Sequence, residues 1–492
     1  MKLKQYIIAS LTCIIGLSAC DLNISPDSYI AEEFFFKDAA QANVAVIGCY
    51  GGMQDPLEYE WALTELRSDN TRMYSSSTTN EVNLQLSVLD LSLISSTNLN
   101  LRYYWEKTYQ NINNCNMVLT PENISVVEDT KLRDQYEGEA LFIRSYHYFN
   151  LVRLFGPVFL VTENISVSES MKKDRSPVTT VYKQIVDDLK LSVEKLTGVT
   201  YSASDLGRTT ELAAKSLLAK VYMTLGQFAE ARPLLKDVID TKGETLVPYA
   251  DIFDVNKEMN AEIIFTVRYM TGNKGIGSPF ANFFAPTNSG TLVIIGSGDG
   301  RNYPTTDLIQ TYDPDDVRKD VSLAENYIDN SKPNPIINDA YVKKFLSPVS
   351  VRYDAENDWP IIRYADVLLM YAEVLNELEG PASGLKYLNM TRQRAGLNAL
   401  TSEELSNRNA FRVELEKERR LELAFENHRW FDLLRWGKTK EVIDNHIHNR
   451  EWAFYSTYSN EPGYMLDYQL ILPIPQNVID NNPGVITQNP NY

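Results

Sequence analysis

The sequence predicts a mainly α-helical fold in which at least one pair of helices forms a tetratricopeptide-like hairpin. Three observations point to this class. Apolar residues recur at helical spacing over several long segments, glycine and proline stand where those segments end, and a Leu-Gly-x-x-Ala turn joins two of them. With 492 residues, of which 44% are hydrophobic and 11% aromatic, the chain can bury a large core.

The first twenty residues are typical of a bacterial lipoprotein signal. Two lysines precede an apolar run over residues 6–17, which ends in Leu17-Ser18-Ala19-Cys20. Such a start and a small-residue cleavage site mark a segment that is removed, and a cysteine directly after the site is the usual lipid acceptor. We expect residues 1–19 to be a signal peptide and Cys20 to carry the lipid. The alternative is an ordinary secretory signal in which Cys20 is incidental.

The rest of the chain offers no membrane-spanning candidate. Downstream of Cys20 no window has the roughly 18 uncharged apolar residues that a spanning helix requires, and the best one, residues 361–378, carries four charges. The net charge is -18, and no basic run with interleaved aromatics is present, so nucleic acid is not an expected partner. Once Cys13 leaves with the signal and Cys20 is lipidated, Cys49 and Cys115 are left, and whether they pair stays open.

The helical segments follow one another along the chain. Residues 136–155 form a long aromatic-rich helix that Gly156-Pro157 stops. A second helix opens after Thr210, its expected cap, and runs to Leu225, where Gly226 turns the chain into a third helix whose apolar stripe reaches residue 239. A hairpin of this kind cannot bury its own apolar face, so neighbouring helices must stack on it.

The C-terminal half supplies three further helices. Residues 361–378 are apolar nearly all round, as expected for a helix at the centre of a large core, and Gly380-Pro381 ends it. A partner helix is expected at residues 385–394. One amphipathic helix, dense in Glu and Arg, is expected at residues 409–436.

Two stretches have a different character. Residues 271–304 combine glycines and three prolines with several aromatics, and their short apolar run at 292–295 is a candidate strand. Residues 449–468 are similarly rich in aromatics. Long loops inside a compact protein are usually functional, and the aromatic content argues against disorder.

An ordered set of short segments extends from the signal to the last residue. It comprises Leu22-Asn23-Ile24-Ser25-Pro26, Phe34-Phe35, Gly48-Cys49-Tyr50, residues 105–116 beginning Trp105-Glu106-Lys107, Gly138-Glu139-Ala140-Leu141-Phe142-Ile143-Arg144-Ser145-Tyr146 up to Phe155-Gly156-Pro157, Gly207-Arg208-Thr209, Arg363-Tyr364-Ala365-Asp366 to Glu373, residues 418–426 and 429–436, Leu472-Pro473-Ile474-Pro475-Gln476 and residues 488–492. Together these segments resemble the SusD-like (RagB/SusD) family.

The resemblance implies a single SusD-like domain over residues 20–492, an all-α scaffold of tetratricopeptide-like helical hairpins with long irregular loop insertions. Residues 20–260 would hold the tetratricopeptide-like helices and residues 261–492 the loop-rich part. It also implies a lipid-anchored outer-membrane protein, exposed at the cell surface, that captures oligosaccharide or polysaccharide for a SusC-like TonB-dependent barrel. Asp21 leaves retention at the inner membrane open, and only the resemblance favours the outer membrane.

Peptide capture by the same architecture is the first alternative function, and a surface degradative enzyme is the second. For the enzyme, the acids between residues 414 and 435 are candidate paired carboxylates, but their alternation with basic residues favours a salt-bridged packing face. Among the remaining motifs, the strand-and-glycine run at 292–300 has the wrong spacing for a phosphate loop, and no Gly-x-Ser-x-Gly element is present. We therefore expect no catalytic residue and no cofactor.

Metal binding is not expected either. His446-x-His448 lacks a third ligand at a diagnostic spacing, so a solvated loop is the favoured interpretation there. The run from Asp313 to Asp316 does not have the spacing of a calcium loop, and we interpret it as a turn in which Asp316 and Arg318 are available for pairing.

A sugar-binding surface needs flat aromatic faces with Asn, Asp and Arg side chains at its rim. Two groups of residues meet this description. The first comprises Trp61, Asp69, Asn70, Arg72 and Tyr74, and the second Phe283, Phe284 and Tyr303. For each aromatic residue the alternative is core packing, and a pocket shared by both groups would favour binding.

Overall fold

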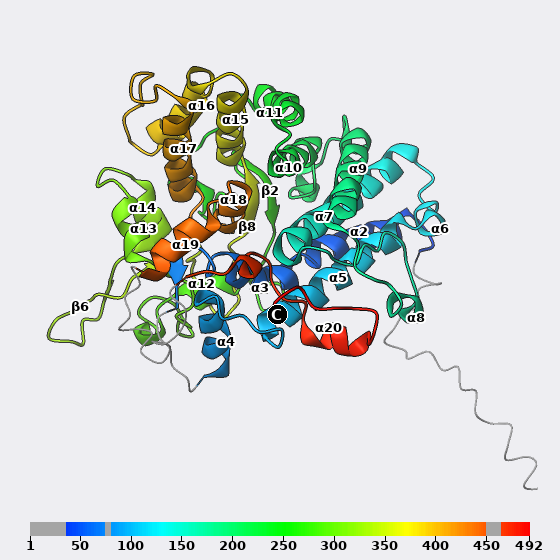
Figure 1. The fold of residues 1–492 in the computed structure, drawn as a ribbon, viewed down its shortest axis with the longest axis horizontal. Helices are drawn as coiled ribbons and strands as arrows, with labels where there is room; N and C mark the ends of the chain where they lie inside the picture. The colour runs from blue at the N-terminus through cyan, green and yellow to red at the C-terminus, as the bar shows by residue number, and fades with distance from the viewer. Residues whose placement is uncertain (1–35, 74–79, 449–463) are drawn as a thin grey trace, which may run out of the picture.

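The computed structural model describes residues 36–73, 80–448 and 464–492. Cys20 and Tyr74 therefore lie outside the described residues, as do residues 449–463 of the second aromatic-rich stretch. Within the described ranges helices predominate, and every sheet has only two strands. The predicted mainly helical class is confirmed (Figure 1).

The helices are distributed along the whole described chain. They are α2 Ala39–Gly51, α3 Gln54–Thr64, α4 Glu81–Asp90, α5 Leu99–Leu119, α6 Pro121–Ile124, α7 Thr130–Phe155, α8 Val167–Ser170, α9 Val178–Leu196, α10 Glu211–Thr224, α11 Phe228–Lys242, α12 Phe280–Phe284, α13 Thr306–Thr311, α14 Arg318–Ser322, α15 Tyr364–Leu378, α16 Pro381–Arg394, α17 Arg408–Glu422, α18 Arg429–Arg435, α19 Thr439–His448 and α20 Gln476–Asn481.

The short strands pair antiparallel between distant segments. They are β1 Thr71–Arg72 with β3 Tyr303–Pro304, β2 Ile263–Val267 with β8 Trp359–Arg363, β4 Leu323–Ala324 with β7 Tyr341–Val342, and β5 Tyr327–Ile328 with β6 Ile336–Ile337. The β2–β8 ladder contains an irregularity in its register, and all five residues of β8 are buried.

The helical scaffold is a continuous array in which each helix packs on the next. The order of contact is α3, α5, α7, α9, α10, α11 and α15, with α16 and α17 on α15 (Figure 1). Thr210 caps α10 as predicted, since its side chain accepts from the Ala213 N–H over 3.2 Å. Gly226, with φ of +72°, makes the turn into α11 because left-handed backbone carries no steric cost in glycine. The hairpin formed by α10 and α11 thus packs against α9 on one side and against α15 on the other.

Four expectations about local structure were wrong in detail. The segment 361–378 begins as strand β8, and the helix starts at Tyr364. The expected helix 409–436 is two helices, because Phe425 and Asn427 take positive φ and break the helical path between α17 and α18. The run 292–295 forms turns and not a strand, since no neighbouring segment pairs with it in the described residues. His446 and His448 lie in helix α19 and not in a loop.

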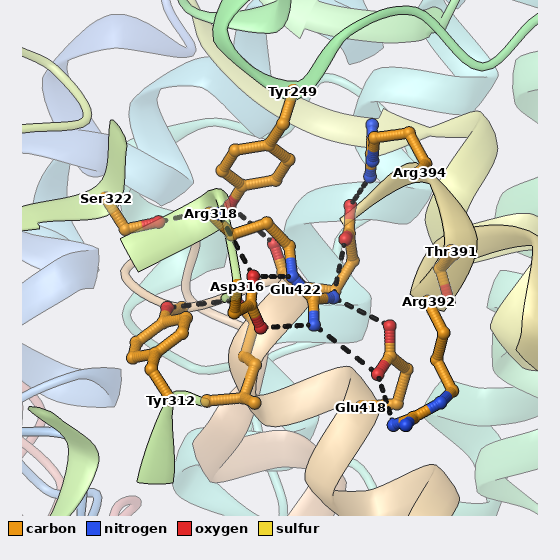
Figure 2. Close-up of polar contacts among 12 residues, drawn as sticks. Tyr249, Tyr312, Asp316, Arg318, Ser322, Thr391, Arg392, Arg394, Glu418 and Glu422 are labelled. Carbon is orange, nitrogen blue, oxygen red and sulfur yellow. Dashed lines mark hydrogen bonds and ion pairs between the residues drawn. The ribbon is translucent and has the colours of Figure 1, made fainter. Parts of the chain in front are cut away.

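Glu418 and Glu422 of α17 form a buried ion network with Asp316 and Arg318 at the start of α14 and with Arg394 at the end of α16 (Figure 2). Arg363 at the end of β8 extends this network. Arg318 pairs with Asp316 at 2.8 Å and with Glu418 at 2.7 Å, as the proposed pairing of Asp316 and Arg318 required. Arg363 uses all five of its N–H donors on Glu262, Glu422 and Glu426. The packing interpretation of this acidic and basic segment is therefore confirmed, and the face is buried, not solvated.

The C-terminal tail returns to the N-terminal half of the fold. The Leu472 N–H donates to the Leu154 carbonyl over 2.6 Å. The Asn489 amide donates to the carbonyls of Phe155 and Leu472 over 2.9 and 2.7 Å. Residues close to the end of the chain thus close the C-terminal end of α7.

Two further expectations concern the membrane and the cysteines. In the described ranges, none of the helices is both long enough and apolar enough to span a bilayer. Cys49 and Cys115 are both buried and free, so they form no disulfide.

Candidate functional site

A cleft of about 420 Å³ lies where two loop segments meet α3. We call it the loop cleft. It is lined by Glu58, Asn273, Gly275, Gly277, Pro279, Phe283, Arg301, Val351, Arg352, Tyr353 and Asp354. The glycine-rich segment therefore forms one wall, as its composition suggested for a functional loop, and the segment before β8 forms the other.

The Asp299 carboxylate gathers three side chains at this cleft. Its Oδ2 accepts from the Tyr353 hydroxyl over 3.0 Å and lies 2.9 Å from Arg301 Nη2. Its Oδ1 pairs with the Arg352 guanidinium. The Arg301 guanidinium lies over the Phe283 ring, 4.1 Å from its centroid. These contacts hold the charged groups in fixed positions relative to the Phe283 ring.

Tyr353 is the aromatic residue that this arrangement presents outward. Its φ of +64° is uncommon for a residue with a side chain. The conformation is held because the Tyr353 N–H donates to Asn282 Oδ1 over 2.9 Å, while the Asn282 amide donates to the carbonyls of Ile295 and Ser297. The Tyr353 residue remains 38% exposed, and its ring meets the edge of Phe283 at 5.5 Å.

Asp354 ties the two walls together. Its Oδ2 accepts from the N–H groups of Gly272 and Asn273 over 2.8 and 2.9 Å. These backbone donors lower the pKa of the Asp354 carboxyl. Opposite it, Gly277 leaves no room for a side chain, since a Cβ there would come within 2.3 Å of Asp354 Oδ1. The walls can approach this closely only with glycine at residue 277.

Another pair of tyrosines lies where α3 packs on α5. Tyr59 and Tyr103 lie with ring centroids 5.4 Å apart, and Tyr103 is among the exposed hydrophobic residues. Burial, followed by the neighbouring Glu58, raises the pKa of Tyr59 to about 12. Burial also raises the pKa of Glu58, and burial lowers that of Arg301 despite the opposing Asp299. The charged groups of the cleft are therefore partly withdrawn from water.

This geometry suits recognition of a neutral polar ligand with flat faces. Tyr353 supplies a ring, and Arg301, Arg352 and Asn273 supply hydrogen-bond donors around the cleft. Asp299 is engaged by three donor side chains and Asp354 by backbone N–H groups, so both carboxylates act here as fixed parts of the wall.

The first group of sequence-predicted residues lies mainly in the core. Trp61 is 1% exposed, and its indole N–H donates to the Glu58 carbonyl over 2.8 Å. Asp69 is buried between Arg420 and Arg429 at 3.0 and 2.8 Å. Burial alone would raise the pKa of the Asp69 carboxyl, but the two guanidinium groups hold it well below its ordinary value.

The other predicted residues surround these. Asn70 is fully buried and accepts from Arg420 Nε over 2.8 Å. Half-buried Arg72 lies opposite Tyr303 in the β1–β3 ladder, with its guanidinium 5.9 Å from the ring centroid. Tyr303 and Phe284 are 2% and 1% exposed.

The structure nevertheless brings the two predicted groups together. Trp61 packs edge-on against Phe284 at 5.2 Å and lies 6.5 Å from Phe283. Of the eight predicted ligand-contact residues, Phe283 lines the loop cleft, and Trp61 and Phe284 support it from behind.

Tyr353 and Arg352, two exposed residues of the loop cleft, were not predicted from the sequence. They belong to the segment before β8, which carries no aromatic cluster or glycine run. The adjacent Arg-Tyr pair at 352–353, in a stretch without helical periodicity, is the signal that could have marked it.

Comparison with known proteins agrees with this architecture. A family model described as "SusD family" matches residues 338–492, and one described as "Starch-binding associating with outer membrane" matches residues 22–223. Two Formosa agariphila proteins are similar over nearly the whole length: SusD-like protein P2 is 27% identical and covered over 100% of both chains, and SusD-like protein P25 is 26% identical over 98% of both.

Solved structures share the fold. A laminarin-binding SusD-like protein has a TM-score of 0.77 at 24% identity, covering 93% of this chain and all of the other. A SusD homologue from Bacteroides thetaiotaomicron has a TM-score of 0.80 at 22% identity, covering 95% of this chain and all of the other. Surface glycan-binding protein A of the same species, in complex with laminarihexaose, has a TM-score of 0.75 at 20% identity, covering 92% and 99%.

The fold and the sequence matches define the class of protein as a helical-scaffold protein with a SusD-like architecture. The chain belongs to the SusD-like (RagB/SusD) family, as its ordered motifs indicated.

Proposed function

We propose that this chain is a cell-surface lipoprotein that captures glycan in the loop cleft and delivers it to a SusC-like TonB-dependent barrel in the outer membrane. The observation that carries glycan capture is the Tyr353 ring, exposed yet locked by Asp299 and by the Asn282 hydrogen bond. A ring that is already held in place loses little conformational entropy when a sugar stacks on it. More of the free energy of stacking therefore remains as binding affinity.

The related proteins support the ligand class. One solved neighbour is named as laminarin-binding, another is complexed with laminarihexaose, and the family model matching the N-terminal part is described as starch-binding. Laminarin and starch are both neutral polysaccharides of glucose, which fits a cleft in which Arg301 and Arg352 are already paired with Asp299.

Phe283, Trp61 and Phe284 take a supporting role in this proposal. They form the aromatic layer under Arg301, which places the guanidinium at the cleft. Asp69, Asn70, Arg72 and Tyr303 stabilise the floor, where β1 meets β3.

Affinity electrophoresis and isothermal titration test the glycan proposal directly. The purified chain should be retained by laminarin or starch, and Tyr353→Ala should weaken binding on the order of ten-fold, as expected for loss of one stacking ring. Tyr464→Ala removes a tyrosine that is 56% exposed outside the cleft and is the matched control. Binding of a peptide pool with no retention by either glycan would contradict glycan capture and favour the peptide alternative.

Anchoring and partnership are tested separately. Growth with an alkyne-tagged palmitate analogue should label the wild-type chain and not Cys20→Ser. Solubilisation in mild detergent should co-purify a TonB-dependent barrel with the wild-type chain. Recovery of the chain alone from cells that express the barrel would contradict the partnership.

A further inference from the structure

Another open cavity, of about 450 Å³, lies between α11, α15 and α17. We call it the helix groove. Figure 1 shows these three helices at the top of the view, away from α3 and α12, which border the loop cleft. The volume of the groove falls within the roughly 300–1,000 Å³ that small-molecule sites occupy. The molecule therefore has room for a ligand at a second place.

The helix groove has an apolar floor that includes two aromatic rings. It is lined by Phe228 at the start of α11, Val413 and Leu415 on α17, and Trp436 directly after α18. Leu415 is 1% exposed and closes the bottom, Phe228 and Trp436 are half-buried, and Val413 is 59% exposed. An apolar floor that stays open to solvent on one side is typical of a ligand site.

The Trp436 indole is held in place by two neighbouring groups. Its N–H donates to Glu373 Oε1 over 2.9 Å, and the Arg435 guanidinium lies over the ring, 4.5 Å from its centroid. Arg435 Nη2 donates in turn to Glu373 Oε2 over 2.7 Å. One edge and one face of the indole are thereby engaged, so the opposite face is the one available to a ligand. A ring fixed in this way loses little conformational entropy on stacking.

The charged side chains of the groove walls pair with one another. Arg412 Nε donates to Glu377 Oε1 over 2.7 Å, and Arg412 Nη1 donates to Asn409 Oδ1 over 3.0 Å. The hydrogen bonds from Arg412 lower the pKa of the Glu377 carboxyl. Lys438 pairs with Glu416. A charged ligand would have to displace one of these pairs, whereas a hydroxyl group can both donate to such carboxylates and accept from such donors while the pairs stay intact.

We propose that the helix groove is a second glycan-binding site, in which a sugar ring stacks on Trp436 and its hydroxyl groups bond to Asn409 and to the Arg412–Glu377 pair. A flat apolar face beside paired charges matches a neutral sugar, which has an apolar face and a polar edge. The ligand class rests on the proposed function, but the groove residues are separate from those of the loop cleft.

Two glycan sites on one chain have a consequence for long polysaccharides. The loop cleft presents the guanidinium groups of Arg301 and Arg352, and the helix groove presents that of Arg412, so the groove should be the weaker site. A polymer that reaches both sites is retained more strongly than an oligosaccharide that occupies one, because the second contact is then intramolecular.

Isothermal titration of the full chain with laminarihexaose and with maltohexaose tests the proposal. The wild-type chain should bind at least one of these sugars at two sites. Trp436→Ala should remove the weaker site and leave the stronger one unchanged, while Tyr353→Ala should weaken the stronger site on the order of ten-fold and leave the weaker one. One bound equivalent in the wild type, unaltered in Trp436→Ala, would overturn the second site and leave the proposed function standing. No binding of either sugar by the wild type would contradict both.

A substitution at the exposed rim keeps the test valid if Trp436→Ala folds poorly. Arg412→Ala removes hydrogen-bond donors from the groove and should weaken the weaker site about five-fold while the thermal midpoint stays near that of the wild type. Arg232→Ala is the matched control, since it breaks a similarly exposed pair, with Glu379, outside the groove lining and should leave both sites unaltered.

The remaining outcomes of these variants decide against the proposal. An equal loss of affinity in Arg412→Ala and Arg232→Ala, or none in either, would overturn the assignment of the groove. Loss of peptide binding or of a co-purifying barrel in Trp436→Ala and Arg412→Ala, with glycan binding unchanged, would show that the groove docks protein and would overturn it as well.

Discussion

Tyr353 donates its hydroxyl proton to Asp299 across 3.0 Å, joining two loop segments that are 54 residues apart in the sequence. The bond determines how an exposed ring is oriented, so the ring and its anchor can be separated by mutation. Tyr353→Phe keeps the ring and loses one hydrogen bond, and glycan affinity should fall by about 1 kcal/mol, roughly five-fold. Titration calorimetry beside Tyr353→Ala gives the comparison. If phenylalanine weakens binding as much as alanine does, the hydroxyl and not the ring carries the affinity.

Gly277 offers a test of the cleft walls that leaves the ligand-facing side chains unchanged. An alanine Cβ there would lie 2.3 Å from Asp354 Oδ1 and 2.5 Å from Asp354 Cα, so the walls must separate. Gly277→Ala should cost about 1–3 kcal/mol of stability and abolish most glycan binding while the helical circular dichroism is retained.

The matched control for that substitution is Gly48→Ala. A Cβ at Gly48, inside α2, meets nothing within 4 Å, so this change should stabilise the chain by about 0.5–1 kcal/mol through helix propensity and leave binding intact. Loss of glycan binding in both variants would show that the effect does not arise at the cleft.

Because of the buried ion network, substitution of Arg363 should destabilise the protein much more than substitution of Arg412. Arg363→Ala removes a guanidinium that pairs with the buried carboxylates of Glu262, Glu422 and Glu426, and should lower the free energy of chemical unfolding by about 3–5 kcal/mol. Arg363→Lys should recover only part of this, since lysine cannot supply the forked donors. Arg412→Ala breaks an exposed pair with Glu377 and should cost under about 1 kcal/mol. Similar costs for Arg363 and Arg412 would contradict a structural role for the network.

Because Glu65 is buried, the free energy of unfolding should decline as the pH rises towards 8. Burial raises the pKa of Glu65 to about 8, although the Asn427 N–H donates to its Oε1 over 2.6 Å. The folded state thus keeps the Glu65 proton at a pH where the unfolded chain, with a pKa near 4.3, has lost it. The free energy of unfolding should fall between about pH 5 and pH 8 by on the order of a few kcal/mol from this group.

Glu65→Gln isolates that contribution. The amide oxygen can still accept from Asn427, and no charge is buried at high pH, so the slope of stability against pH should become smaller than in the wild type. Glu403→Gln, at an exposed residue, should leave the slope unchanged. An unaltered slope in Glu65→Gln would mean that other groups control the pH response.

The two free thiols should resist chemical modification in the folded chain. The hydrogen bond with Cys115, together with burial, raises the pKa of Cys49, and reactivity requires a thiolate that solvent can reach. A thiol reagent should titrate neither Cys49 nor Cys115 in a Cys20→Ser chain until denaturant is added. Reaction of one equivalent under native conditions would show that this part of the core opens.

Periodicity predicted those parts of the fold that depend on short-range sequence. The C-terminal end of α7 and the turn between α10 and α11 follow from Gly156 and Gly226, and the cap on α10 from Thr210, whereas α7 begins at Thr130 and not at residue 136 as predicted. The break between α17 and α18 could not be predicted, because it depends on Phe425 and Asn427 adopting positive φ within a buried network whose partners, Lys344 and Arg363, lie far away in sequence.

The site was harder to predict than the fold for a related reason. Sequence composition identified aromatic residues, but the largest of them fill the core: Trp61 and Phe284 pack behind Phe283, while the exposed ring belongs to a single tyrosine in an unremarkable segment. Whether a ring faces solvent is decided by long-range packing. Asp69 was likewise predicted to lie at the rim of a binding site. It is buried instead, because Arg420 and Arg429, more than 300 residues later in the sequence, pair with its carboxylate.

The return of the tail to α7 bears on when the chain can reach its native state during synthesis. Because Asn489 supplies the donors for the Phe155 and Leu472 carbonyls, a nascent chain still lacking its last few residues has an N-terminal half with open bonds. These two hydrogen bonds can form only after the last residues have left the ribosome, so the C-terminal end of α7 is completed late in synthesis.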